Sequence, residues 1–439
     1  MHLNPEDKSR LGDGVTVVKE PPGPDRPAQR DPEVSATVST MLLDIEQRGL
    51  DAVRDYAERL DRWSGTSFEV SPAQLRGAGD SLPADLREAL DAGAERTRRF
   101  AVMQRERLVD FEDEVIPGVV CGQRYVPVQT VGAYLPAGRF PLLASAFMTV
   151  GVAAVAGVPN VVSCTPPSLD GGPHPAVLYA AYASGAERVF AIGGVQALAA
   201  MAFGLLDAPA ADMLVGAGNA YVAEAKRQLF GRVGIDVLAG PSEVAVIADD
   251  TATTQMVAAD LLGQAEHGPT SPACLVTTSE RLAREVPGEI DRQLAALSTR
   301  EIAGAAWREY GSIYLVDSRE LAVAVMDTLA PEHLEVLTDD LPWYLDNLSN
   351  YGSLFLGPWS TVAYADKGMS GTNHVLPTGR NARFTGGLSV AGFLKLVTYQ
   401  RATMGSTQAQ ARPVVIISDF EKLQAHRDSA QLRLEYQHG

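Results

Sequence analysis

Cysteine and histidine are both scarce in this sequence, and basic residues do not outnumber acidic ones. The three cysteines, Cys121, Cys164 and Cys274, are far apart and form no CxxC pair, which excludes a disulfide framework and a thiolate zinc cluster. The 37 Lys and Arg residues against 54 Asp and Glu give a net charge of −17, so nucleic acid and anionic membranes are poor partners. No apolar run reaches the roughly 20 residues of a membrane span. We therefore expect a reducing, cytoplasmic location.

The composition is that of a globular protein, with 46% hydrophobic and 21% charged residues in a chain of 439 residues. A chain of this length is expected to divide into two or three domains. Residues 1–34 are charged and rich in proline, so we expect a flexible N-terminal tail. Apolar residues then recur with helical spacing at Val38, Met41 and Ile45. This pattern predicts a helical lead-in over residues 35–130.

Short β-branched runs, such as residues 161–164 and 244–247, alternate with Ala-rich helical runs through the middle of the chain. This alternation is typical of βαβ units around a parallel sheet. We expect the α/β class, with one incomplete Rossmann-like domain over residues 131–247 and a second over 248–378. The similar alternation suggests a duplicated architecture, although no residue-level repeat supports it. Residues 379–439 predict a C-terminal helical tail that reaches a partner subunit.

Gln264 and His267 stand three residues apart at the end of a predicted helix. Their side chains therefore share one face of that helix and are able to bind one metal ion. An imidazole combined with amide and carboxylate oxygens suits zinc or manganese, provided that distant residues complete the coordination sphere. The alternative is a histidine that caps the helix end, and the spacing alone does not decide between the two.

Glu332 and His333 place a carboxylate directly beside an imidazole. These two side chains are the ones best able to relay protons near neutral pH, so the pair is a candidate catalytic dyad. Adjacent Glu and His residues are also common on protein surfaces, and the pair alone does not exclude that reading.

Two glycine turns join a predicted strand to a predicted helix, at Gly193-Gly194 and at residues 216–219, Gly-Ala-Gly-Asn. Backbone N–H groups and the helix dipole attract phosphate at such a junction, so a dinucleotide is expected over one of them. Neither turn is a full GxGxxG motif, and each also fits a turn required for tight packing. Ser242, in Gly240-Pro241-Ser242, starts a further strand and reads as a cap or a substrate contact.

Taken together and in this order, seven segments resemble the histidinol dehydrogenase family. The resemblance runs from about residue 35 to the end of the chain. The segments are Tyr134-Leu135-Pro136-Ala137-Gly138, Gly193-Gly194-Val195-Gln196, Gly218-Asn219-Ala220-Tyr221-Val222, Ala239-Gly240-Pro241-Ser242-Glu243, Gln264-Ala265-Glu266-His267-Gly268, Ala330-Pro331-Glu332-His333-Leu334 and Gly371-Thr372-Asn373-His374.

The resemblance implies a zinc-dependent, domain-swapped homodimer that reduces two NAD molecules in succession. Gln264 and His267 match metal ligands of the family, with manganese as the alternative to zinc. His426 matches a C-terminal ligand that the partner subunit donates, and Glu421 matches a carboxylate that contacts substrate. Tyr134, Gln196 and Asn219 match NAD contacts, while Ser242 and His333 join the metal ligands in holding substrate.

One implied ligand departs from the family pattern. The family's metal-binding aspartate lies seven residues before the His of Gly-Thr-Asn-His, and Lys367 occupies that position here. A charged lysine cannot bind a metal ion. Asp366 lies one residue earlier, and Gly368 gives the loop the freedom to absorb that shift. We therefore expect Asp366 to be the ligand.

The implied chemistry converts an alcohol, through an aldehyde that stays bound, to a carboxylate. His333 removes the alcohol proton while hydride passes to NAD, and the metal orients the substrate as a Lewis acid. Glu332 then activates water, His333 deprotonates the hydrate, and a second NAD accepts the second hydride.

The substrate is open between two classes. Several segments are similar to paralogues such as sulfopropanediol dehydrogenases, and an anionic substrate would favour cationic contacts such as Arg139 or Lys367. The spacing of Glu421 ahead of His426 resembles histidinol enzymes, in which a carboxylate helps to bind a cationic substrate. We favour a paralogue that acts on a diol or amino alcohol. The segments similar to the paralogues are residues 139–142, 225–232, 366–367 and 398–401.

A different class of function is a non-catalytic nucleotide-binding protein that kept the fold and lost its metal site. The displaced aspartate is the observation that supports it. This alternative predicts no metal-dependent NADH formation with any alcohol.

Overall fold

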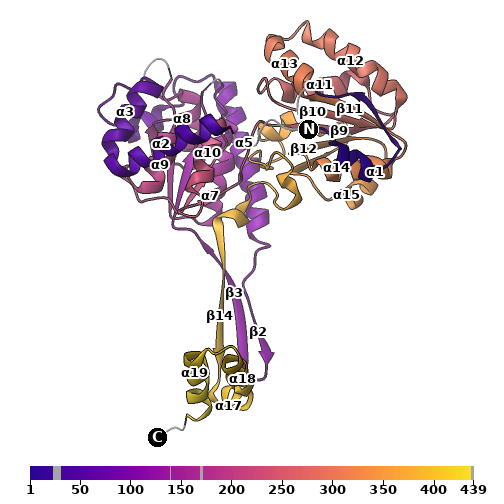
Figure 1. The fold of residues 1–439 in the computed structure, drawn as a ribbon. Helices are drawn as coiled ribbons and strands as arrows, with labels where there is room; N and C mark the ends of the chain where they lie inside the picture. Colours follow the sequence, from indigo (N-terminus) through magenta and orange to yellow (C-terminus); the bar gives the residue numbers. More distant parts are fainter. Residues whose placement is uncertain (23–30, 139, 169–171, 437–439) are drawn as a thin grey trace.

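The computed structural model describes residues 1–22, 31–138, 140–168 and 172–436. Two α/β lobes lie side by side, and a long stalk extends from beneath them to a small helical end (Figure 1). The α/β class with parallel sheets, expected from the sequence, is confirmed. Within these residues no helix is both long and apolar enough to cross a membrane. Arg139, a candidate substrate contact, lies outside the described residues.

The first lobe is built on a five-stranded parallel sheet in the order β6-β5-β4-β7-β8. The third, second, first, fourth and fifth strands along the chain therefore lie side by side. The strands are β4 (Thr130–Tyr134), β5 (Asn160–Thr165), β6 (Arg188–Ala191), β7 (Met213–Val215) and β8 (Gly234–Ile235). The helices are α2 (Pro32–Arg48), α3 (Leu50–Asp61), α4 (Pro72–Gly77), α5 (Ala84–Arg105), α6 (Ala144–Ala146), η1 (Phe147–Gly151), α7 (Val152–Ala156), α8 (Pro175–Ala183), α9 (Gly194–Phe203) and α10 (Ala220–Leu229).

The second lobe repeats this strand order in β11-β10-β9-β12-β13, with β1 added antiparallel at the edge. The shared order agrees with the suggested duplication of architecture. The strands are β1 (Val15–Lys19), β9 (Val244–Ala248), β10 (Ala273–Thr277), β11 (Gly311–Val316), β12 (His333–Leu337) and β13 (Ser353–Leu356). The helices are α1 (Pro5–Leu11), α11 (Thr254–Ala265), α12 (Glu280–Leu294), α13 (Arg300–Tyr310), α14 (Arg319–Leu329), α15 (Leu341–Asn347) and α16 (Val362–Asp366).

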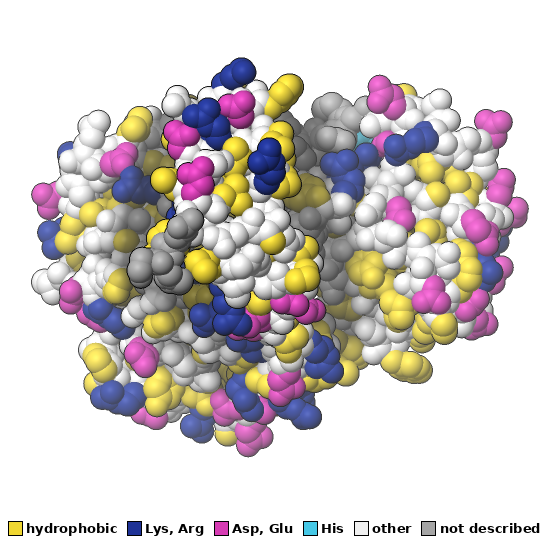
Figure 2. Space-filling view, turned by 90° about the horizontal axis from the view of Figure 1, so that it is seen from below, with side chains coloured by type: hydrophobic (Ala, Val, Ile, Leu, Met, Phe, Trp, Pro, Cys, Tyr) yellow, Lys and Arg dark blue, Asp and Glu magenta, His cyan; other side chains and the backbone are white. Residues whose placement is uncertain are grey.

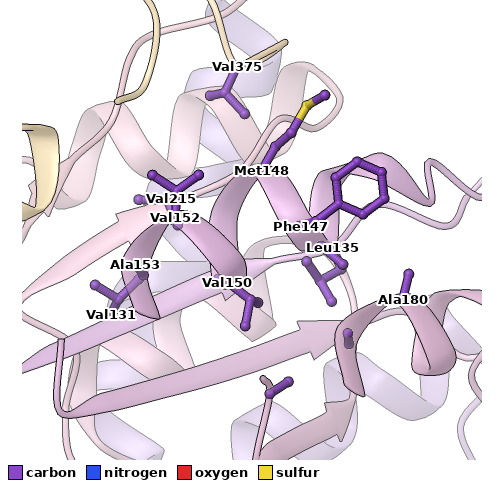
Figure 3. Close-up of a cluster of buried hydrophobic side chains, with 14 of the residues drawn as sticks. Val131, Leu135, Phe147, Met148, Val150, Val152, Ala153, Ala180, Val215 and Val375 are labelled. Carbon is purple, nitrogen blue, oxygen red and sulfur yellow. The ribbon is translucent and has the colours of Figure 1, made fainter. Parts of the chain in front are cut away.

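Both sheets are buried on their two faces, as their near-continuous apolar strands require. In the second sheet every residue of β9, β10 and β12 is buried. Helices α11, α12, α13 and α16 pack on one face, and α14 packs on the other. The first lobe has the same layered arrangement, and Figure 3 shows part of its core, in which Phe147 of η1 lies near Leu135 and Val152 of α7 lies near Val215 of the sheet.

The stalk is a three-stranded antiparallel sheet in the order β14-β3-β2. Strand segments therefore replace part of the helices expected in residues 35–130 and 379–439. Eight of the nine residues of β14 are exposed, so the strand lacks the alternation of buried and exposed positions that would have revealed it. Its elements are β2 (Phe111–Ile116), β3 (Val119–Pro127), η2 (Asn381–Arg383), η3 (Val390–Phe393), β14 (Leu394–Ala402), α17 (Met404–Gln410), α18 (Arg412–Phe420) and α19 (Gln424–Leu434).

The N-terminal segment differs from the flexible tail that its composition suggested. Residues 1–19 form α1 and β1 on the second lobe, and Leu3 is only 1% exposed in its core. Asp7 also forms an ion pair with Arg380. The β-branched run that becomes β1 is short and lies beside a proline-rich stretch, which hid it. Residues 23–30, the remainder of the expected tail before α2, lie outside the described residues.

The Leu3→Ala substitution is therefore expected to lower the free energy of unfolding by about 3 kcal/mol, because it leaves a cavity in a packed core. The measurement is urea unfolding followed by tryptophan fluorescence. Leu43→Ala is the control, because Leu43 is 58% exposed and its truncation is expected to cost less than about 0.5 kcal/mol. Equal effects of the two substitutions would contradict the docking of the N-terminal segment.

Candidate active site

Glu332 and His333 lie at the amino end of β12, and both side chains are buried. β12 pairs in parallel with β9, and this pairing sets His333 opposite Val244. Glu243, directly before β9, therefore lies beside the dyad. The side chains of Glu332, His333 and Glu243 meet between β9 and β12, where the strand order of the sheet reverses. They lie at the amino edge of that sheet. Ligands in open α/β sheets usually bind at the opposite, carboxyl edge.

The Glu332 carboxylate is held by two donors from the same turn. The hydroxyl of Ser242 and the backbone N–H of Glu243 both donate to Oε2 of Glu332, each at 2.8 Å. In return the N–H of Glu332 donates to Oε1 of Glu243 at 3.3 Å. This reciprocal bonding fixes the position of the carboxylate, whose Oε2 accepts both hydrogen bonds.

His333 has one ring nitrogen occupied and one free. Nδ1 lies 3.0 Å from the carbonyl oxygen of Glu243 and 3.4 Å from Oε2 of Glu332. A carbonyl oxygen only accepts, so Nδ1 carries the proton. Nε2 is buried and has no hydrogen-bond partner among the described residues. In the neutral ring Nε2 is therefore a free acceptor, which is what a general base requires.

The pKa of His333 reflects two opposing effects. Burial lowers it, but the adjacent Glu332 carboxylate, with smaller effects from Asp366 and the Glu243 carbonyl, raises it to about 9. The protein alone therefore favours a protonated ring near neutral pH. A cation bound nearby would oppose that charge.

Three side chains expected to hold a metal come from two parts of the second lobe. Gln264 lies in the last turn of α11, His267 follows that helix, and Asp366 ends α16. Nε2 of His267 lies 3.9 Å from Oδ2 of Asp366. Two ligands of one tetrahedral zinc ion are about 3.4 Å apart, because each bond is about 2.1 Å long. The pair is therefore close to the spacing of ligands to a common ion.

An unpaired amide oxygen supports a ligand at this place. Nε2 of Gln264 donates to the hydroxyl of Ser242, which fixes the orientation of the amide. Its Oε1 is buried and has no partner among the described residues. An amide oxygen, an imidazole and a carboxylate form a donor set that fits zinc or manganese. In the described part of the chain no three His, Cys, Asp or Glu side chains gather to hold a metal, so the amide of Gln264 would be needed beside His267 and Asp366.

Asp366, and not Lys367, points into this centre. Asp366 is buried, whereas the Lys367 side chain is 69% exposed and its Nζ lies 3.9 Å from the carboxylate. Burial would raise the pKa of Asp366, but the neighbouring His374, His333 and Lys367 lower it overall. Burial lowers the pKa of His267. An ionised carboxylate and a neutral imidazole are the forms that bind metal.

His374 is a neighbour of the centre that was not singled out as a site residue. Its Nδ1 lies 3.9 Å from Oδ1 of Asp366, and its Nε2 lies 3.0 Å from the hydroxyl of Ser145. Asn373 donates to the carbonyl of Met148 at 2.7 Å, and Val375 packs into the first-lobe core beside Met148 (Figure 3). The loop that carries Asp366 is thus fastened to the first lobe. In the sequence, the Gly-Thr-Asn-His segment was the feature that could have identified His374 as a site residue.

The expected NAD contacts lie at the carboxyl edge of the first sheet. Tyr134 ends β4, and its hydroxyl accepts from the N–H of Gly194 at 3.2 Å. Gln196 lies one turn into α9, and its buried Oε1 has no partner among the described residues. Asp61, which sequence reasoning missed, accepts from Gly193 N–H and from Gln196, each at 2.9 Å. Gly193 is therefore already paired with a carboxylate and does not offer its N–H to phosphate.

The second glycine turn lies beside Tyr134 and is open. A Cβ on Gly216 would stand 2.2 Å from the carbonyl oxygen of Tyr134, so only glycine fits there. Asn219 is exposed and caps α10 through the N–H groups of residues 221 and 222. Lys226 and Asp236 form a buried ion pair that holds this turn in place. Lys226 donates to the carbonyl oxygen of Gly216, and Asp236 accepts from the N–H of Gly216. The first N–H of each glycine turn is therefore paired with a carboxylate, while residues 218 and 219 of this turn are exposed.

Glu421 and His426 are not brought to this centre within one chain. Both are exposed, and they lie at the far end of the stalk, near α18 and α19 (Figure 1). Figure 2, which looks from below, shows hydrophobic side chains among charges of both signs over the lower face. The exposed apolar residues at the stalk end include Ile416, Ile417 and Phe420.

Two α/β lobes, one with a buried Glu-His pair and one with glycine turns at the ends of its strands, are the arrangement expected of a nucleotide-dependent enzyme, and the comparisons give the family. The chain matches the family model described as histidinol dehydrogenase over residues 24–434. A histidinol dehydrogenase homolog from Ruegeria pomeroyi is 48% identical over 96% of this chain and 97% of its own length. Sulfopropanediol 3-dehydrogenase from the same organism is 46% identical over 92% of both chains.

The structural comparison agrees. The crystal structure of histidinol dehydrogenase from Elizabethkingia anophelis matches with a TM-score of 0.88 and 35% identity, covering 93% of this chain and 94% of that one. The chain belongs to the histidinol dehydrogenase family, a family of dehydrogenases. The resemblance drawn from the seven segments is confirmed.

In the metal-free protein the Glu332→Gln substitution is expected to lower the pKa of His333 below about 9. The substitution removes the carboxylate that raises this pKa, while burial, which lowers it, remains. At pH 8 a larger fraction of the ring is then neutral. The measurement is an NMR titration of the imidazole carbon resonance, with Glu320→Gln on the surface of the same lobe as the control. An unchanged value in Glu332→Gln would refute the assignment.

Proposed function

We propose that the chain is an NAD-dependent dehydrogenase that uses a divalent metal, zinc or manganese, to oxidise a small primary alcohol through a bound aldehyde to a carboxylate. The observation that carries the proposal is a pair of buried acceptors, Nε2 of His333 and Oε1 of Gln264, for which the described residues provide no hydrogen-bond partner. Buried polar atoms almost always have partners, so atoms left without one point to a ligand.

The roles of the side chains follow from their bonds. His333 takes the alcohol proton on Nε2, because Nδ1 is committed to the Glu243 carbonyl. Glu332 stabilises the imidazolium that forms, since its Oε2 lies 3.4 Å from Nδ1. Gln264, His267 and Asp366 would hold the metal. When bound, the metal supplies Lewis-acid polarisation and a template, and NAD supplies the hydride acceptor.

The second oxidation uses the same groups. Glu332 activates the water that adds to the bound aldehyde, and Ser242, which donates to Glu332, orients its carboxylate. His333 then removes the proton of the hydrate. Burial of both dyad residues keeps bulk water away, so the aldehyde stays in the site between the two steps.

The nicotinamide nucleotide is expected along the carboxyl edge of the first sheet. Tyr134 and Asn219 flank the turn at Gly216, and the buried amide oxygen of Gln196 has no hydrogen-bond partner in the part of the chain that the structure describes. The loop after Asp366, fastened to the first lobe through Asn373, joins this edge to the metal ligands. This contact supports a site in which the two halves of the reaction lie close together.

The substrate we favour is a small diol or amino alcohol, such as a sulfopropanediol, over histidinol. Identity is 46% to the sulfopropanediol 3-dehydrogenase and 40% to the histidinol dehydrogenase of Methanosarcina mazei. The exposed Lys367 ammonium beside Asp366 offers a contact for an anionic group. Glu421, if supplied by a partner, favours a cationic substrate instead.

A second copy of the chain is proposed to complete the site. A fourth donor would complete a tetrahedral set around the metal, and His426 and Glu421 lie exposed on a stalk that extends away from its own lobes. The exposed apolar side chains there are the kind that an intersubunit contact buries. A domain-swapped homodimer in which each stalk end reaches the other copy satisfies both observations.

The function is tested by following NADH formation with zinc-loaded or manganese-loaded protein and a panel of sulfopropanediol, histidinol and related amino alcohols and diols. Sulfopropanediol or a related diol is expected to give the highest kcat/KM, and a chelator is expected to abolish turnover. Strong preference for histidinol would overturn the choice of substrate. No metal-dependent NADH formation with any alcohol would overturn the proposed function.

The control for this panel is His333→Asn. It removes the base and is expected to reduce kcat by at least about a hundredfold, the usual contribution of such a group. Its zinc content should equal that of the unchanged protein, because His333 is not placed among the metal ligands. Retained activity would exclude His333 as the base.

Sharing of the site between copies is tested by complementation. His426→Ala and Asp366→Ala proteins are each expected to be inactive, because each dimer lacks one ligand at both sites. Co-expressed chains should recover about a quarter of the activity, since half of the dimers are mixed and each mixed dimer has one complete site. Absence of recovery, with mixed dimers present by mass spectrometry, would contradict the donation of His426 by a partner.

A further inference from the structure

A second carboxyl pair lies deeper in the second lobe, outside the catalytic centre. Glu335 is fully buried on β12, with Val246 of β9 and Phe355 of β13 beside it in register. Asp260 of α11 faces it within hydrogen-bonding reach. Two carboxyl groups side by side in an apolar core are costly unless something neutralises one of them.

Hydrogen bonds around the pair show how it is held. Oε1 of Glu335 accepts from the backbone N–H of Val362 at 2.8 Å. The hydroxyl of Thr361 donates to Oδ1 of Asp260 at 3.1 Å. Oε2 of Glu335 receives no N–H or O–H donor from the described residues. A proton shared with Asp260 satisfies that oxygen and removes the repulsion at the same time.

The electrostatics agree with this arrangement. Burial, and then the charge of Asp260, raises the pKa of Glu335 to about 8. Burial also raises the pKa of Asp260. Asp260 is the ionisable side chain that acts on Glu335, since the neighbours on β9 and β13 are apolar and α16 contributes Val362 N–H and the Thr361 hydroxyl. The pair therefore holds one proton near neutral pH.

The three elements joined by this pair are the three that carry the candidate site. Glu335 lies two residues after His333 on the same face of β12. Asp260 lies four residues before Gln264, one turn along the same face of α11. Val362, which Glu335 binds, lies four residues before Asp366 in α16. Glu335, Asp260 and Val362 therefore each lie one helical turn or one strand repeat from a residue of the proposed metal or catalytic centre.

Helix α16 depends on the hydrogen bond between Val362 and Glu335 more than a longer helix would. It has only five residues, and Thr361 at its N-cap makes no side-chain capping bond. A helix of this length is not stable by itself. The bond from Val362 N–H to Glu335 therefore anchors the first turn of the helix whose last residue is Asp366.

We propose that the Asp260–Glu335 pair, joined by a shared proton, is a positioning device that sets the spacing of Gln264, His267 and Asp366. Asp260 and Glu335 touch neither metal nor substrate, so they act through the elements they hold. The inference rests on the metal site of the proposed function. Removing the pair is expected to loosen that site, as loss of groups behind metal ligands commonly weakens affinity by about tenfold or more.

The test compares two substitutions of one residue. Glu335→Gln keeps both bonds, because its carbonyl accepts from Val362 and its amide donates to Asp260. Glu335→Leu removes both. Zinc affinity is measured by competition with a chelator. Glu335→Leu is expected to weaken binding by at least about tenfold, whereas Glu335→Gln stays within about threefold of the unchanged protein.

A second measurement, which does not depend on metal, accompanies the measurement of zinc affinity. Hydrogen exchange at residues 362–366 of the metal-free protein should accelerate in Glu335→Leu and not in Glu335→Gln. Leu329→Ala is the matched control, since Leu329 is fully buried in the same lobe on the opposite face of the sheet. It is expected to lower stability while leaving zinc affinity and this exchange unchanged.

The outcomes separate the two proposals. If Glu335→Leu does not fold, the Asp260→Leu/Glu335→Leu double variant replaces it, because exchanging both partners for apolar groups avoids a buried unpaired charge. Unchanged zinc affinity in a folded Leu variant, or equal losses in Glu335→Leu and Leu329→Ala, overturns the positioning role. Failure of the unchanged protein to bind zinc overturns the metal site itself.

Discussion

The parallel pairing of β9 with β12 is the constraint on which the candidate site depends. It sets the turn that contains Ser242 and Glu243 against the start of β12, so that Glu332 is held by two donors. The same pairing brings the Glu243 carbonyl to Nδ1 of His333 and leaves Nε2 without a hydrogen-bond partner among the described residues. A shift of one residue in this register would turn both side chains to the opposite faces of the sheet. The positions of both side chains, and with them the proposed chemistry, therefore depend on the register of these two strands.

The two lobes use the same strand order for different purposes. The carboxyl edge of the first sheet presents glycine turns at the ends of β6 and β7, in the manner of nucleotide-binding sheets. The amino edge of the second sheet presents the dyad and, through the ends of α11 and α16, the candidate metal ligands. The loop that ends in Val375 packs into the first lobe and joins the two edges. The same strand order thus presents different candidate residues at opposite edges of the two sheets.

Much of this arrangement was predictable from the sequence, and the departures have physical causes. The parallel strands were visible because apolar β-branched runs alternate with helical runs, as β9, α11 and β10 do. The strands of the stalk escaped notice because β14 is exposed along nearly its whole length. The N-terminal segment was read from its charge and proline content, while Leu3 and the short β1 decided its position. Asp61 was missed because it reaches Gly193 across 132 residues of chain.

The sequence by itself determined the chemistry that is available: a Glu-His dyad, an amide and an imidazole at helical spacing, glycine turns at strand ends, and membership of a family of dehydrogenases. Tertiary structure decided which of these groups meet. It buried Asp366 and exposed Lys367, so that Asp366 is the candidate ligand. It also placed His374 beside Asp366 and Asp260 beside Glu335, and it left His426 at the end of the stalk. Residue types and local spacing are encoded along the chain, whereas burial, register and approach arise only when distant segments pack against one another.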